Sequence, residues 1–128
     1  MRIILTRDII AHCGNLVDQS KKEGLLFSGN LLYFVIYDVF SPYAFFGLKI
    51  NKTSAIMKCA YVSKDYRGQG TLLKMINARL NWIKENKPNI KTVYANCTNM
   101  SLNSHLKSGA KIVTKYKNEI TKIKYEIL

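Results

Sequence analysis

Hydrophobic and polar positions change their spacing several times along the chain, and each change predicts a different element of secondary structure. Residues 1–6 form a short apolar run that is typical of a strand. From Arg7 or Asp8 onward, apolar residues recur every three to four positions, which predicts an amphipathic helix. These residues are Ile9, Ile10, Cys13, Leu16 and Val17. A strand and then a helix are therefore expected at the start of the chain.

A block rich in β-branched and aromatic residues follows the turn signal at Ser28-Gly29-Asn30. Leu31–Phe40 and Tyr43–Asn51 lie on either side of Ser41-Pro42, which predicts a β-hairpin. Ala55–Val62 is a third strand, and both of its faces are largely apolar. That pattern favours a position at the centre of a sheet.

The clearest helix is Thr71–Asn86, which Pro88 brings to an end. Arg79 falls inside the apolar arc of this helix. We expect its aliphatic stem to pack against the core while its charged head reaches solvent. The apolar positions fall within an arc of about 100° and are Leu72, Leu73, Ile76, Leu80 and Ile83.

The remaining elements are a strand at Thr92–Cys97, a short helix at Asn99–Ser108 and a closing hairpin of Ala110–Tyr116 with Ile120–Leu128. The predicted order is therefore β-α-β-β-β-α-β-α-β-β. This order indicates an α/β fold of the α+β type, with one mixed central sheet. A length of 128 residues with 48% hydrophobic residues predicts a single domain, residues 1–128.

Composition narrows the class of protein. The apolar run at the start is too short for a signal peptide, and Leu31–Leu48 contains Asp38 and a Ser-Pro turn, so no membrane span is expected. Three cysteines without close spacing and only two histidines argue against a disulfide scaffold and against a metal site. We therefore expect a soluble cytoplasmic protein with reduced thiols.

The net charge of +12 is concentrated in the second half of this basic protein. Residues 64–128 carry thirteen Lys and Arg against four Asp and Glu, whereas residues 1–63 carry seven against four. This excess of positive charge in residues 64–128 is suited to binding a polyanion such as nucleic acid or an acidic protein surface. A Lys-rich composition without any such partner would produce the same excess. Strand alternation predicts one shared face for the lysines of the closing hairpin, with Tyr116 and Tyr125 on the other face. These lysines are Lys111, Lys115, Lys117, Lys122 and Lys124.

The segment Arg67-Gly68-Gln69-Gly70 lies between the predicted strand Ala55–Val62 and the predicted helix Thr71–Asn86. Its two glycines allow positive φ angles and leave room for a bulky anion. The helix that begins at Gly70 or Thr71 directs free N–H groups and the positive end of its dipole toward such an anion. Thr71 offers a hydroxyl and Arg67 a cation. The spacing is neither that of a Walker loop nor that of a dinucleotide-binding loop.

With these residues the chain resembles the GCN5-related N-acetyltransferase (GNAT) family, whose signature is [Gln/Arg]-x-x-Gly-x-[Gly/Ala]. Val62, Arg67 and Gly70 match it, and the element order fits along nearly the whole chain. The resemblance implies acetyl-CoA, or another short acyl-CoA, as cofactor. Backbone groups of Ala60, Tyr61 and Val62 would pair with the pantetheine arm. The pyrophosphate would be held by the loop and first helical turn: Arg67, Gly68, Gln69, Gly70, Thr71, Leu72 and Leu73.

Leu72 departs from the signature, because the family has Gly or Ala at that position. One explanation is that Leu72 belongs to the core arc of its helix. The other is that its larger side chain crowds the cofactor and weakens binding.

A second family landmark is an Asn followed by a small residue, a Tyr and a Gly. Counting back from Gly109 places Thr98 at the Asn position and His105 at the Tyr position, and Asn99 is the alternative for the Asn role. Many family members use that Tyr to protonate the departing thiolate. A histidine has a suitable pKa for the same task, so His105 is a candidate general acid.

The general base has a weaker candidate. Many family members hold a Glu on the central strand, but Ala55–Val62 contains no carboxylate. Asp38 is the only acid in an apolar run, and burial there would raise its pKa toward a useful value. Attack by an amine that is already neutral, with water taking the proton, is the alternative.

The resemblance therefore predicts an enzyme that transfers an acetyl or short acyl group from acyl-CoA to a primary amine. The alternative is a catalytically inactive GNAT-like binding module that contacts nucleic acid through its basic C-terminal half. The absent Tyr, the absent Glu and Leu72 favour the alternative, and the intact Arg67-Gly68-Gln69-Gly70 loop favours the enzyme. A homodimer is also left open.

Overall fold

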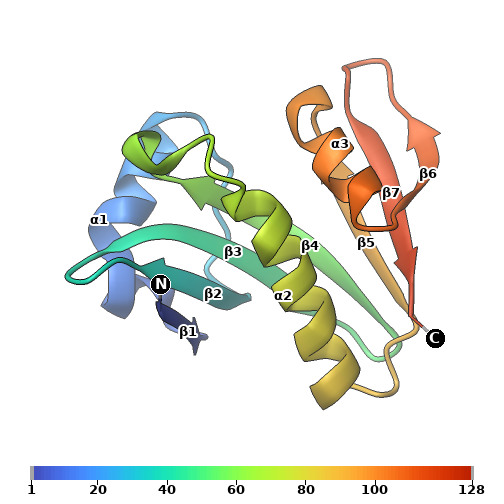
Figure 1. Ribbon diagram of the computed structural model, residues 1–128, viewed down its shortest axis with the longest axis horizontal. Helices are drawn as coiled ribbons and strands as arrows, with labels where there is room; N and C mark the ends of the chain where they lie inside the picture. Colours follow the sequence, from blue (N-terminus) through green and yellow to red (C-terminus); the bar gives the residue numbers. More distant parts are fainter. Residues whose placement is uncertain (1, 128) are drawn as a thin grey trace. The chain divides into compact units, whose positions relative to one another are not determined.

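The computed structural model describes residues 2–127, which form seven strands, three α-helices and one turn of 3-10 helix (Figure 1). The strands lie in the order β1-β2-β3-β4-β5-β7-β6. The α/β class and the predicted element order are both confirmed. The elements are β1 (Arg2–Thr6), α1 (Ile9–Lys22), β2 (Leu32–Tyr37), β3 (Pro42–Ile50), β4 (Ser54–Val62), η1 (Lys64–Tyr66), α2 (Thr71–Asn86), β5 (Thr92–Cys97), α3 (Asn99–Lys107), β6 (Lys111–Lys115) and β7 (Thr121–Glu126).

The chain divides into two compact parts. The first comprises residues 2–49 and Lys58–Gln69, and the second comprises Ile50–Met57 and residues 70–127. Strand β4 contributes its beginning to the second part and its end to the first. None of the helices that the structure describes is both long enough and apolar enough to span a membrane.

In the first part, α1 packs against one face of the antiparallel strands β1, β2 and β3. Asp8 caps α1 by accepting a hydrogen bond from the backbone N–H of Ala11, at 3.4 Å. The apolar stripe of α1 meets the inward side chains of the sheet, as its spacing predicts. The shared core is Ile9, Cys13, Leu16, Val17, Leu31, Tyr33, Val35, Tyr37, Phe45 and Tyr61.

The hairpin between β2 and β3 differs slightly from its prediction. Pro42 begins β3 and is paired with Tyr37, so the turn occupies residues 38–41. Asp38 therefore lies in the turn. Its carboxylate Oδ1 accepts hydrogen bonds from the backbone N–H groups of Phe40 and Ser41, each at 2.9 Å. A short acidic side chain that binds the backbone two and three residues ahead stabilises a turn.

In the second part, the first half of β4 pairs in parallel with β5, and β7 joins β5 to the edge strand β6. Side chains alternate between buried and partly exposed along β5 and β7. Helix α3 contacts β5 and β7, and α2 contacts α3. One face of these strands is therefore covered by helix.

Arg79 corrects the prediction for α2. Its side chain is only 1% exposed, and its Nε donates to the backbone carbonyl of Met75 at 3.1 Å. The charged head does not reach solvent, and burial lowers the pKa of Arg79 to about 10. Met75 is also buried and was not among the expected core positions. Helical periodicity identifies which face is inward, but it does not show how deep that face lies.

The lysines of the closing hairpin do not all share one face. A register shift between Ile112 and Thr114 sets Lys111 opposite Lys124 but Lys115 opposite Thr121. Facing residues in an antiparallel pair point to the same side of the sheet, so Lys111 and Lys115 point to opposite sides. The expected common face is therefore wrong, and the reason is the extra residue of a β-bulge.

Candidate cofactor-binding site

Three residues at the end of β4 were expected to pair with a cofactor. Ala60 is exposed, Tyr61 is buried and Val62 is half-buried. The parallel register of β4 with β5 runs from Ser54 to Met57, so this pairing does not use the backbone groups of Lys58–Val62.

Cys59 precedes these three residues and has a φ of 55° within the strand. Non-glycine residues rarely adopt the left-handed region, and doing so costs on the order of 1–3 kcal/mol. Its Sγ lies 3.4 Å from the backbone carbonyl of Leu26. Such a local irregularity re-aims the residues that follow it in a strand.

The loop after β4 has the backbone that the glycines predicted. The φ angles of Gly68 and Gly70 are 77° and 74°, and Gly70 is the N-cap of α2. A Cβ built on either glycine would meet no other atom within 4 Å. Open space therefore surrounds a loop whose backbone leads into a 16-residue helix. The free N–H groups and dipole of a helix N-terminus make this a suitable place for an anion.

Arg67 is held by the protein itself. Its Nη2 lies 2.6 Å from Oε1 of Glu23, and its Nε donates to the backbone carbonyl of Val62 at 2.9 Å. Its guanidinium also lies over the ring of Tyr61, 5.6 Å from the centroid. The arginine predicted to act as a cation for the anion is thus fixed to the end of α1 and to β4.

Glu23 is the residue of this cluster that sequence reasoning missed. It caps the C-terminus of α1 and accepts hydrogen bonds from Arg67 and from the hydroxyl of Tyr61. These bonds lower the pKa of the Glu23 carboxyl, that from Arg67 most strongly, and they raise the pKa of Arg67. Glu23 lies 44 residues before Arg67 in a segment without a motif, so only the folded chain reveals the pair.

Asp38 lies beside the same loop but is not buried as expected. Its second carboxylate oxygen accepts a hydrogen bond from the hydroxyl of Tyr66, whose ring stacks on that of Tyr43 at 4.2 Å between centroids. Hydrogen bonds from Tyr66, Ser41 and Phe40 lower the pKa of Asp38 to about 2. The expected rise in pKa is wrong. A carboxyl with so low a pKa is a weak proton acceptor.

The first turn of α2 contains the remaining loop residues. Thr71 is buried, whereas Leu72 and Leu73 are half-buried. Leu72 is therefore neither a fully enclosed core residue nor a fully exposed one.

His105 lies in α3, buried against β7 and only 5% exposed. Its Nδ1 is 2.6 Å from the hydroxyl of Tyr125. Burial, and then the charge of Arg79, lower the pKa of His105 to about 4. The imidazole is therefore neutral near pH 7, which makes it a poor proton donor. Its role as general acid is still a prediction, and these observations weigh against it.

Thr98 and Asn99 mark the start of α3, and both are exposed. The backbone carbonyl of Thr98 accepts from the N–H groups of Ser101 and Leu102 at 3.1 and 3.0 Å. The Thr98 side chain makes no cap hydrogen bond. Within residues 2–127 no group of three His, Cys, Asp or Glu could hold a metal ion.

Comparison with known proteins gives structural matches only. No family model matches the sequence, and neither does any curated protein. A candidate N-acetyltransferase of Lactobacillus plantarum has a TM-score of 0.80 and 14% identity, over 99% of this chain and 98% of that chain. An acetyltransferase of the GNAT family from Streptococcus pneumoniae has a TM-score of 0.75 and 8% identity, over 99% and 100%.

A third match is the N-acetylglutamate synthase of Neisseria gonorrhoeae, solved with coenzyme A and N-acetylglutamate. It has a TM-score of 0.73 and 11% identity, and covers all of this chain but 36% of the synthase. These matches show that the chain has the same mixed α/β fold as these acetyltransferases. Its fold is that of the GCN5-related N-acetyltransferases.

Proposed function

We propose that the protein is an N-acyltransferase that passes an acetyl or other short acyl group from acyl-CoA to an amine. The observation that carries this proposal is the open loop of Gly68 and Gly70, which joins β4 to the N-terminus of α2 within a GNAT fold. The coenzyme A in the Neisseria gonorrhoeae synthase of similar fold supports the same cofactor.

The geometry of the loop supports the binding of a diphosphate. Side chains are absent at the two positions where the backbone turns, and the added Cβ atoms would enter open space. Backbone N–H groups from Gly68 to Leu73 would bind the diphosphate. Arg67, fixed by Glu23, would position the loop rather than bind the anion. Backbone groups of Ala60, Tyr61 and Val62 would pair with the pantetheine arm.

Bound acyl-CoA would supply an activated thioester. The residues of this chain would contribute orientation, together with backbone N–H groups that stabilise developing negative charge. Asp38 and His105 have low pKa values, so neither is well suited to acid–base work at pH 7. We therefore propose that the acceptor reacts as a neutral amine, with water accepting its proton.

Calorimetry with acetyl-CoA and with CoA tests the cofactor directly. Gly70→Glu should abolish binding, because it adds a negative charge and a side chain at the anion position. Gly109→Glu is the matched control: it also replaces an exposed positive-φ glycine, with φ 101°, but at the end of α3. Wild-type protein that binds no acetyl-CoA at millimolar concentration would refute the proposal.

A free-thiol assay against a panel of amines then separates turnover from binding. Binding without turnover on any amine would favour the alternative of an inactive binding module. Leu72→Ala addresses the departure from the family signature. If the half-buried Leu72 crowds the cofactor, the alanine variant should bind CoA more tightly than wild type.

A further inference from the structure

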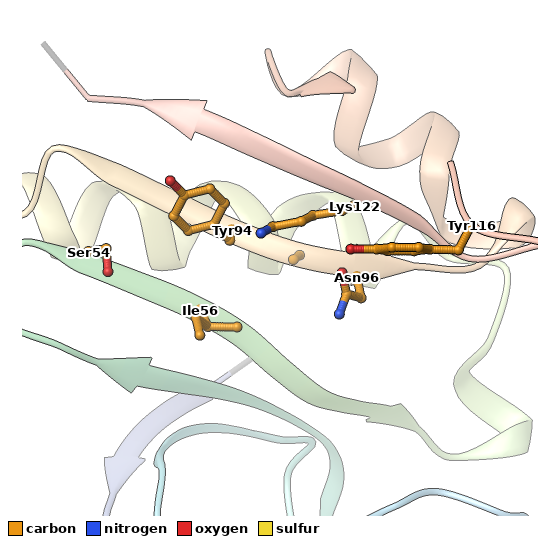
Figure 2. Close-up of a pocket in the computed structure, with 7 residues that line it drawn as sticks. Ser54, Ile56, Tyr94, Asn96, Tyr116 and Lys122 are labelled. Carbon is orange, nitrogen blue, oxygen red and sulfur yellow. The ribbon is translucent and has the colours of Figure 1, made fainter. Parts of the chain in front are cut away.

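A hollow of about 430 Å³ lies on the second part of the chain, over strands β4, β5 and β7. Figure 2 shows its lining side chains, with Lys122 directed toward the ring of Tyr94 and Tyr116 extending toward the same space. This volume is within the usual range for small-molecule sites. The lining residues are Ser54, Ile56, Tyr94, Ala95, Asn96, Tyr116 and Lys122.

The hollow is on the face of the strands that α3 does not cover. Along β7, Tyr125 is buried and bonded to His105 of α3. Lys122 has the opposite parity from Tyr125, and on β5 it faces Asn96 and neighbours Tyr94. Side chains of opposite parity point to opposite faces of a sheet, so Lys122 and Tyr94 project away from α3.

The β-bulge in β6 brings Tyr116 to this face. With regular alternation, Tyr116 and the lysines would lie on opposite sides, as the sequence predicted. The register shift after Ile112 reverses the parity, and Tyr116 lines the hollow together with Lys122. An aromatic wall is thus added beside a lysine.

Among the lining residues that the structure describes, Lys122 alone is charged. Its Nζ lies 4.8 Å from the ring centroid of Tyr94, and it has no carboxylate partner within residues 2–127. The neighbouring Lys124, in contrast, is 3.2 Å from Glu126. A half-buried ammonium that contacts only a ring keeps its capacity to bind an anion.

Other polar side chains of the lining also lack hydrogen-bond partners among the described residues. The side chains of Ser54, Tyr94, Asn96 and Tyr116 form no hydrogen bond in the described part of the chain. The second part carries twelve Lys and Arg against three Asp and Glu, and none of these three acidic residues is in the lining. The hollow therefore combines free hydrogen-bond donors, a positive potential and apolar walls.

We propose that this hollow binds a small carboxylate that also carries an apolar or aromatic side chain, such as an apolar amino acid. Lys122 binds the carboxylate, and Tyr94, Tyr116 and Ile56 contact the side chain. This binding does not depend on the proposed acyl transfer. Nucleic acid fits less well, because the bulge places Lys115 on the opposite face from Lys111 and Lys124 and so shortens the row of lysines on one face.

Binding is tested by NMR titration of the full chain without CoA. The probes are two matched pairs: L-phenylalanine with phenethylamine, and L-leucine with isoamylamine. Each pair differs only in its carboxylate. Saturable shifts near Lys122, with at least one carboxylated amine bound tenfold or more tightly than its partner, are expected. Equal binding within both pairs, or no binding by either amino acid, would overturn the proposal.

Substitutions at Lys122 test whether this side chain causes the preference for a carboxylate. Lys122→Met should abolish the tenfold preference, Lys122→Arg should retain it, and the control Lys124→Met should leave it unchanged. An unchanged preference in a folded Lys122→Met protein would overturn the proposal. Tight binding of oligothymidylate that depends on Lys122 and displaces the amino acid would also overturn it, in favour of a nucleic-acid site.

The two proposals fail separately. If acetyl-CoA does not bind but the amino acid does, the proposed acyl transfer fails and the hollow stands. If acetyl-CoA binds but neither amino acid does, the hollow fails and the proposed cofactor site stands.

Discussion

The guanidinium of Arg67 lies 2.6 Å from the carboxylate of Glu23, so the loop that follows β4 is fixed to the C-terminal end of α1. Tyr61 donates to the same carboxylate from within β4. Both charged side chains are about half exposed, at 47% and 40%. An exposed pair contributes little to folding, so its main effect is on the position of the loop.

Glu23→Gln should therefore weaken acetyl-CoA binding roughly threefold to tenfold, while the melting temperature changes little. The reason is that the uncharged amide holds Arg67 less firmly. Calorimetry and thermal unfolding measure the two effects. Glu85→Gln, at an exposed position on α2, is the control and should change neither. Equal affinities for Glu23→Gln and wild type would show that the pair does not position the loop.

Gly47→Ala should destabilise the protein by about 2 kcal/mol or more. A Cβ at this position of β3 would lie 2.7 Å from the backbone carbonyl oxygen of Lys58 and 2.8 Å from the Leu31 side chain, so the backbone at Lys58 must shift. Urea unfolding measures the loss. Gly29→Ala is the control, because its nearest contact would be 4.0 Å away. Similar stabilities for the two variants would contradict the close approach of β4 to β3.

The pKa of His105 is about 4 in the folded protein, compared with 6.5 for an ordinary histidine. The unfolded chain binds the proton more tightly, so this group stabilises the fold fully above pH 6.5 and loses that effect as pH falls toward 4. The loss totals roughly 3 kcal/mol, since one pKa unit is about 1.4 kcal/mol. His105→Asn should flatten this part of the stability profile in urea unfolding. His12→Asn, at an exposed position, should leave the slope intact.

The low pKa of Asp38 depends first on the hydroxyl of Tyr66. Tyr66→Phe should raise the carboxyl pKa from about 2 toward the ordinary value of 3.8. Asp38 stabilises the fold above pH 3.8 and loses that effect as the pH falls toward 2, so the variant should lose this acid-dependent contribution. NMR titration of the Asp38 carboxyl measures the shift. Tyr116→Phe, at a hydroxyl distant in sequence and in the other part, is the control.

The glycine loop and the elements around it follow from the sequence. Thr71–Asn86 and Thr92–Cys97 have the predicted boundaries, because periodicity, Pro88 and the glycines act locally. The positive φ angles of Gly68 and Gly70 also follow from residue type. Backbone conformation in these segments depends on near neighbours, which the sequence displays directly.

The partners and the burial of the charged side chains depend on the tertiary structure and could not be predicted from the sequence. Sequence spacing did not indicate that Arg67 pairs with Glu23, that Arg79 is enclosed, or that His105 bonds to Tyr125. One extra residue in β6 moved Tyr116 to the face of Lys122. The pKa of a side chain and the face it occupies depend on burial and on partners distant in the chain, and these exist only after the elements have packed.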